Sequence, residues 1–298
     1  MTHEAEPHGT RRPILLATDL SARCDRAMDR AARLAAEWGT ELVVLHVLDE
    51  SAARLPCAAE RELPSWQRGP EPLAIMTEAL NLDLEGVSVP VTPIVEVGDI
   101  ADVILKTADA HGCGLIVTAV ARDLPLGGFL LGATVDKVLR RARVPVLVVR
   151  QRPRHSYGGI VVAADVSPAS RAALRQTAAF FPDTPFHVFH AFDPPLDGLL
   201  SDPTEYRAAF GQLATQDLEA FLADAGIGPG HVIDIMVERG DPAQLIQHYV
   251  TAFRADLVVV GTEGRSALLE LLVGSTAKSV LDGLACDALV VPAADPLP

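Results

Sequence analysis

The chain has 298 residues, of which 49% are apolar, and its formal net charge is −14 at pH 7. This length predicts two domains, and the apolar content is sufficient for packed cores. Neutralising nucleic-acid phosphates requires grouped Lys and Arg, and the acidic chain has no such group, so we expect no nucleic-acid partner.

The first residues are polar, and no apolar run approaches the roughly 18 residues of a membrane span. We therefore expect a cytoplasmic protein without a membrane partner. The cysteines have no Cys-x-x-Cys spacing, which favours buried single thiols over disulfides or metal ligands. They are Cys24, Cys57, Cys113 and Cys286.

Short apolar runs alternate with helical patterns along the whole chain, which is typical of a parallel sheet covered by helices. In the first half, the expected strands are 13–18, 41–47, 92–97, 114–120 and 145–150. In the second half they are 159–165, 185–191, 232–237, 256–261 and 287–291. The second half should also contain helices at 168–181, 204–225, 241–252 and 274–284.

The two halves are copies of one unit. The segment Ile14–Ser21 is similar to Ile160–Ser167, and Val95–Asp99 is similar to Val237–Asp241. This spacing indicates an internal duplication. The polar stretch from residue 151 to residue 158 predicts a linker between a first domain, 1–150, and a second domain, 159–298.

Five strands per copy favour a doubly wound α/β sheet with one switch point. Ligands of such sheets bind beyond the carboxyl ends of the strands at that point. If the first and fourth strands are neighbours, Asp165 and Gly261 should flank the site. Asp99 and Asp241 are interpreted as helix N-caps, and His46 and His190 as packed histidines, so no catalytic or metal-ligating residue is assigned.

The fourth strand of the second half is followed by Gly261-x-x-Gly264, nine residues, and then Gly274-Ser275. Glycine permits close approach of the backbone to a ligand, and a helix start offers unpaired N–H groups. Together they suit an anion such as phosphate. The spacing is neither a Walker A loop nor a dinucleotide fingerprint. A plain turn followed by an N-cap is the alternative interpretation.

At these residues the chain resembles the universal stress protein (UspA) family, as two tandem units. The resemblance rests on Ala-Asp-x-Ser after the first strand, His near the end of the second, Gly-Asp before the third helix, and Gly-x2-Gly-x9-Gly-Ser. It implies strand order 3-2-1-4-5 and pairing of the last strands, Val144–Val149 with Ala288–Val291. The last motif is the family's signature for binding ATP.

Carried over to this sequence, the family pattern implies an adenine nucleotide in the second domain, as ATP with or without Mg²⁺. Asp165 and Ala163 should lie on the adenine side, where Ala191 should contribute its backbone. Val260 and Gly261 should pass beneath the nucleotide. The phosphates should be held by Gly264, Gly274, Ser275 and Thr276, and Arg265 is a further phosphate candidate because it adjoins Gly264.

The first domain lacks this set. Ala119 stands at the position of Gly261, Arg122 at that of Gly264, and Ala133 at that of Ser275. We therefore expect the first domain to bind ATP weakly or not at all, although Gly127-Gly128 leaves room for a differently shaped loop.

The favoured function is a nucleotide-responsive stress or signalling module. The alternatives are a slow ATPase or phosphotransferase, and a scaffold that acts without nucleotide. The resemblance also implies that the two domains form a pseudo-dimer within the chain, and it leaves a homodimer open.

Overall fold

The computed structural model describes residues 12–50, 71–120, 122–123, 129–130, 132–195, 204–227, 230–262 and 275–293. The chain divides into two compact units, Met1–Ala119 and Val120–Pro298. None of the helices in the described residues is both long enough and apolar enough to cross a membrane.

The first unit is built on four parallel strands in the order β3-β2-β1-β4. The inner strand Ile14–Thr18 is almost completely buried, as expected for a sheet covered on both faces. The strands are β1 (Ile14–Thr18), β2 (Leu42–Leu48), β3 (Val91–Val97) and β4 (Leu115–Ala119). The helices are α1 (Asp25–Trp38), α3 (Pro72–Asp83) and α4 (Ile100–Ala110).

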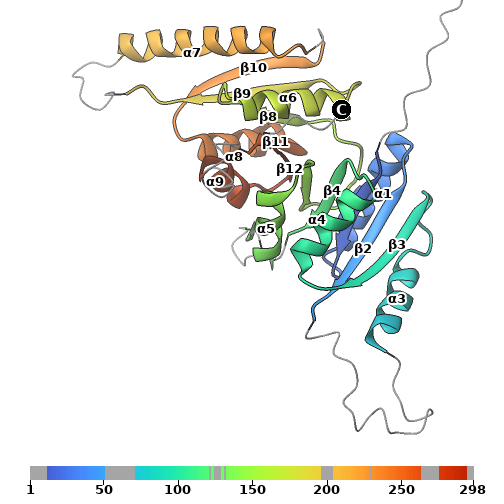
Figure 1. Ribbon diagram of the computed structural model, residues 1–298. Helices are drawn as coiled ribbons and strands as arrows, with labels where there is room; N and C mark the ends of the chain where they lie inside the picture. The colour runs from blue at the N-terminus through green and yellow to red at the C-terminus, as the bar shows by residue number, and fades with distance from the viewer. Residues whose placement is uncertain are drawn as a thin grey trace, which may run out of the picture. The chain divides into compact units, whose positions relative to one another are not determined.

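The second unit contains five parallel strands in the order β10-β9-β8-β11-β12 (Figure 1). They are β8 (Ile160–Ala163), β9 (Phe186–Phe192), β10 (Val232–Arg239), β11 (Leu257–Gly261) and β12 (Asp287–Val291). The helices that follow these strands are α6 (Pro168–Phe180), α7 (Thr204–Asp224), α8 (Pro242–Phe253) and α9 (Ser275–Gly283).

The second unit also includes elements from the end of the first repeat. They are the short strands β5 (Arg122–Asp123) and β6 (Phe129–Leu130), helix α5 (Ala133–Arg141) and strand β7 (Val146–Val149). Strand β7 pairs antiparallel with β12, so that Leu147 lies opposite Leu289. This confirms the predicted pairing of the last strands.

The predicted α/β class is confirmed, and the second repeat has the complete order 3-2-1-4-5. The first four strands of the first repeat follow 3-2-1-4. The antiparallel pairing of β5 with β6 is not among the elements expected from the sequence. It places Arg122, the counterpart of Gly264, in a strand, whereas the predicted fourth strand ends at residue 120.

A buried carboxylate joins the end of the first repeat to the second. Asp287 is 1% exposed, and its Oδ1 accepts hydrogen bonds from the backbone N–H groups of Arg150 (2.7 Å) and Gln151 (3.0 Å). The Tyr157 hydroxyl donates to Oδ2 at 2.6 Å. The Arg150 guanidinium donates to the carbonyls of Leu281 and Leu284, at the end of α9. These bonds hold the residues after β7 against β12 and α9.

Replacing Asp287 by Ala should lower the free energy of unfolding by about 3 kcal/mol, because two buried donors, the Arg150 N–H and the Tyr157 hydroxyl, and the partly buried Gln151 N–H lose their acceptor. The control Tyr157→Phe removes one of these bonds, keeps the ring, and should cost about 1 kcal/mol. Urea denaturation followed by circular dichroism measures both. Equal losses in the two variants would contradict the central role of the carboxylate.

Candidate functional site

The first and fourth strands are neighbours in both repeats, as predicted: β1 pairs with β4, and β8 pairs with β11. In the second repeat, the carboxyl edge of the sheet therefore gathers the ends of β8, β9 and β11. The edge includes the half-buried Ala163 and Ala191, the buried Val260, and Gly261. Asp165 follows β8 by two residues and is exposed.

The chain turns sharply after β8. The Ser167 N–H donates to Asp165 Oδ1 at 3.2 Å, and the Ser170 hydroxyl donates to the same oxygen. The Ser170 hydroxyl in turn accepts from the Asp165 N–H at 2.9 Å. Val166, which lies between Asp165 and Ser167, has a backbone φ angle of 62°, which a β-branched residue rarely adopts. We call Asp165–Ser170 the second acidic turn.

The hydrogen bonds of this turn set the charge state of its carboxyl group. Partial burial alone would raise the pKa of Asp165, but the hydrogen bonds from Ser167 and Ser170 outweigh it. The net pKa lies below the usual value. Asp165 is therefore an anion at neutral pH. Ser170 is not among the predicted site residues, although its Ser-x-x-Ser spacing from Ser167, the N-cap of α6, could have indicated it.

A histidine from the second strand supports the start of the turn. His190 Nδ1 lies 2.7 Å from the Ala164 carbonyl oxygen, and in the first repeat His46 Nδ1 lies 3.0 Å from the Thr18 carbonyl oxygen. A neutral or charged imidazole donates a hydrogen bond in this arrangement. Both histidines are thus packed and hydrogen-bonded, as predicted.

Gly261 has a different neighbour from the one expected. A Cβ atom added to it would lie 2.4 Å from the Ala169 carbonyl oxygen and 2.5 Å from the Ala169 carbonyl carbon. The space beside this glycine is therefore filled by the first turn of α6 and not by a ligand. Contact between the Gly261 backbone and a nucleotide stays a prediction, but a bulky substitution there would also displace α6.

The predicted phosphate side is described only in part. Ser275 and Thr276 are the first two residues of α9, and their backbone is helical. The structure does not describe the side chains of these two residues. The other predicted phosphate residues, Gly264, Arg265 and Gly274, lie outside the described ranges. The helix start nevertheless falls where the Gly-Ser motif predicted it.

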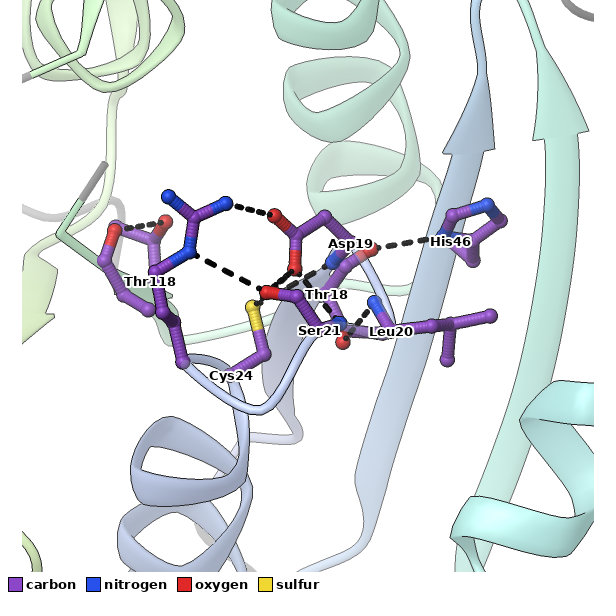
Figure 2. A network of polar contacts seen from close by, with 9 residues as sticks. Thr18, Asp19, Leu20, Ser21, Cys24, His46 and Thr118 are labelled. Carbon is purple, nitrogen blue, oxygen red and sulfur yellow. Dashed lines mark hydrogen bonds and ion pairs between the residues drawn. The ribbon is translucent and has the colours of Figure 1, made fainter. Parts of the chain in front are cut away.

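The first repeat contains an equivalent turn, Asp19–Cys24, which we call the first acidic turn (Figure 2). Ser21 N–H donates to Asp19 Oδ1 at 2.9 Å, and Leu20 has φ = 56°. Cys24 replaces Ser170, with its Sγ 3.1 Å from Asp19 Oδ1. The Arg23 guanidinium donates to Asp19 Oδ2 at 3.1 Å, a contact with no counterpart in the second acidic turn, where Ala169 stands at this position.

Other predicted side chains have structural roles. Asp241 caps α8 by accepting from the Gln244 N–H at 2.9 Å, and Asp99 caps α4 through the N–H groups of Ala101 and Asp102, so both N-cap predictions are confirmed. Three predicted free thiols are confirmed and buried, whereas Cys57 lies outside the described residues; the three are Cys24, Cys113 and Cys286. Within the described ranges, no group of three or more His, Cys, Asp or Glu could hold a metal ion.

Ser170→Ala should raise the pKa of Asp165 toward its ordinary range, because the hydroxyl that stabilises the carboxylate is removed. A depressed pKa in the folded state stabilises the protein above the unfolded-state value. This contribution disappears as the pH falls through the folded-state pKa, so the variant should lose it at a higher pH. NMR titration of the carboxyl carbon measures the shift. As a control, Cys24→Ala should shift the pKa of Asp19 and leave the pKa of Asp165 unchanged. A shift in the pKa of Asp165 in this variant would contradict the view that the two turns act independently.

Comparison with known proteins agrees with this geometry. The family model described as the universal stress protein family matches residues 10–150 and 156–292. A universal stress protein of Mycobacterium tuberculosis is 26% identical over 310 residues, which cover 94% of this chain and 96% of that protein.

Solved structures show the same fold. A universal stress protein from Archaeoglobus fulgidus superposes with a TM-score of 0.68 at 19% identity, covering 95% of this chain and 98% of the other. A functionally unknown protein from Pseudomonas aeruginosa gives 0.67 at 23% identity, covering 95% and 92%. The two matched segments account for nearly the whole sequence, and each contains one acidic turn. The chain therefore belongs to the universal stress protein family, with two tandem domains.

Proposed function

We propose that the second repeat binds ATP at the carboxyl edge of β8, β9 and β11, and that the bound nucleotide controls a stress or signalling response. The observation that carries this proposal is the state of Asp165. Its Oδ1 is held by Ser167 and Ser170, whereas its Oδ2 accepts no hydrogen bond from any described residue. An exposed anion with one open oxygen suits the amino or hydroxyl donors of adenosine.

The start of α9 supports the phosphate half of the proposal. The first N–H groups of a helix have no partner within it, and they carry partial positive charge. Because the chain has a net charge of −14, local backbone donors must overcome a repulsive field for a triphosphate to bind. Gly274 and Gly264 would let the backbone approach the phosphates, and Ser275, Thr276 and Arg265 would add hydroxyl and guanidinium donors.

Binding is favoured over catalysis. Rapid phosphoryl transfer needs a positioned base or water-orienting residue and a cation on the transferred group. Asp165 accepts hydrogen bonds from two serines, and His190 Nδ1 is hydrogen-bonded to the Ala164 carbonyl oxygen, so both residues have structural partners. Mg²⁺, if present with the nucleotide, should be held mainly through phosphate oxygens, because this ion usually keeps several waters and few protein ligands.

Gly274→Val should reduce ATP affinity at least tenfold, because the side chain would occupy the space of the phosphates at the start of α9. The measurement is isothermal titration calorimetry of the full chain with ATP, together with the absorbance ratio and mass spectrometry of purified protein for retained adenine nucleotide.

The matched control is Gly132→Val, since Gly132 is the N-cap of α5 and the counterpart of Gly274 in the first repeat. It should leave ATP affinity unchanged. Absence of nucleotide and of ATP binding in the unmodified protein would favour a scaffold instead. Multiple-turnover phosphate release that Gly274→Val abolishes would establish an ATPase.

A further inference from the structure

The two acidic turns begin alike but lead into helices that start at different positions. In the second turn, α6 starts at Pro168, one residue after Ser167. In the first turn, α1 starts only at Asp25, whereas the counterpart of Pro168 is Ala22. The first repeat therefore begins its helix three residues later, although Leu20 and Val166 share the same left-handed backbone.

Backbone hydrogen bonds show the same shift. The Arg171 N–H donates to the Ser167 carbonyl at 3.1 Å, which is an α-helical bond. In the first repeat, the Cys24 N–H donates to the Ser21 carbonyl at 2.7 Å, which is the tighter i to i−3 bond of a 3₁₀ turn. The bond leading into α1 runs from Met28 N–H to the Cys24 carbonyl at 2.8 Å, three residues later than its counterpart.

Two residues favour the earlier start in the second repeat: Pro168 at the first position of α6, where the first repeat has Ala22, and the glycine at the end of the fourth strand. Strands β1 and β4 pair in the same register as β8 and β11, with Leu16 opposite Val117 and Val162 opposite Val259. Ala119 and Gly261 consequently occupy equivalent positions. The Ala169 carbonyl group lies where a Cβ of residue 261 would be. A helix turn with the geometry of α6 is thus incompatible with the side chain of Ala119.

The late start of α1 changes which side chain contacts the Asp19 carboxylate. Arg23, the counterpart of Ala169, lies in the non-helical turn and donates to Asp19 Oδ2, the oxygen that is open in Asp165. The Arg23 and Asp19 side chains are 51% and 54% exposed. Exposed ion pairs change an equilibrium by less than about tenfold, so Arg23 alone is a weak barrier and the helix start is the larger effect.

We propose that Gly261 is a positioning residue. By leaving room for the first turn of α6, it keeps the Oδ2 atom of Asp165 available to a ligand. In the first repeat, Ala119 shifts the helix start and allows the Arg23 guanidinium to bind the Asp19 carboxylate. This inference rests on the proposed function, because it assigns the nucleotide to the repeat with glycine at this position. It gives a physical reason, independent of the phosphate loop, for unequal binding by the two repeats.

The loss-of-site test is Gly261→Ala in the full chain. We expect amide hydrogen exchange at Arg171 to become at least tenfold faster, and ATP affinity to fall at least tenfold. The matched control is Gly158→Ala, because a Cβ at Gly158 would meet only an Asp256 oxygen at 3.9 Å. It should change neither readout. Unchanged exchange at Arg171 in Gly261→Ala would overturn the inference.

The gain-of-site test avoids any risk that Gly261→Ala fails to fold. In Ala119→Gly combined with Arg23→Ala, the first helix should extend backwards, so that the Asp25 amide gains protection at least tenfold by bonding to the Ser21 carbonyl. Equilibrium dialysis with ATP at millimolar concentration should then reveal a second, weaker site. Arg23→Ala alone should gain neither protection nor a site, and a second site in that single variant would contradict the leading role of the helix start.

The two readouts separate this inference from the proposed function. If the amides respond as expected but no variant and no unmodified protein binds ATP, the proposed function fails and the ligand role assigned to Gly261 fails with it. If the unmodified protein binds one ATP and the double variant shows no change in exchange or stoichiometry, the proposed function stands and the inference is overturned.

Discussion

The close contact between Gly261 at the end of β11 and the carbonyl group of Ala169 in α6 is the constraint on which the candidate site depends. It allows α6 to begin at Pro168, within the second acidic turn. The Ser167 and Ser170 hydrogen bonds then fix Asp165 Oδ1, whereas Oδ2 accepts no hydrogen bond from the part of the chain that the structure describes. The availability of Asp165 Oδ2 to a ligand is thus a consequence of the packing of Gly261 against the backbone of Ala169.

The duplication lets the same scaffold be compared with itself. Strand register, the left-handed residue of the turn, and the histidine bonded to the preceding backbone are all retained in both repeats. The differences that reach the two carboxylates include Arg23, Cys24 and Ala119, with their counterparts Ala169, Ser170 and Gly261. Such a pattern is expected when one copy keeps the fold while its ligand chemistry changes.

Most of the architecture could be predicted from the sequence, because buried parallel strands leave continuous apolar runs, and N-caps such as Asp241 leave a local signature. The pairing of the last strands, Val144–Val149 with Ala288–Val291, came from the family resemblance and is confirmed, and the structure adds its antiparallel direction. The hairpin of β5 and β6 was missed, since two-residue strands have no detectable period.

The candidate site was predicted less completely. The positions of Asp165 and Gly261 followed from the topology, but the neighbour of Gly261 did not, because glycine alone does not reveal whether helix or ligand fills the adjacent space. Arg23 could not be assigned to Asp19 without the helix start, which depends on long-range packing. The resemblance suggested phosphate contacts at Gly264 and Gly274, and adjacency to Gly264 suggested Arg265; all three stay predictions.

The most direct test of the account is the stoichiometry of ATP bound by the unmodified full chain, measured by equilibrium dialysis with radiolabelled ATP up to saturation. One high-affinity equivalent per chain is the predicted result, because only the second repeat combines the early start of α6 beside Gly261 with the complete Gly-x2-Gly-x9-Gly-Ser motif. Two equivalent sites per chain, or no binding, would contradict it.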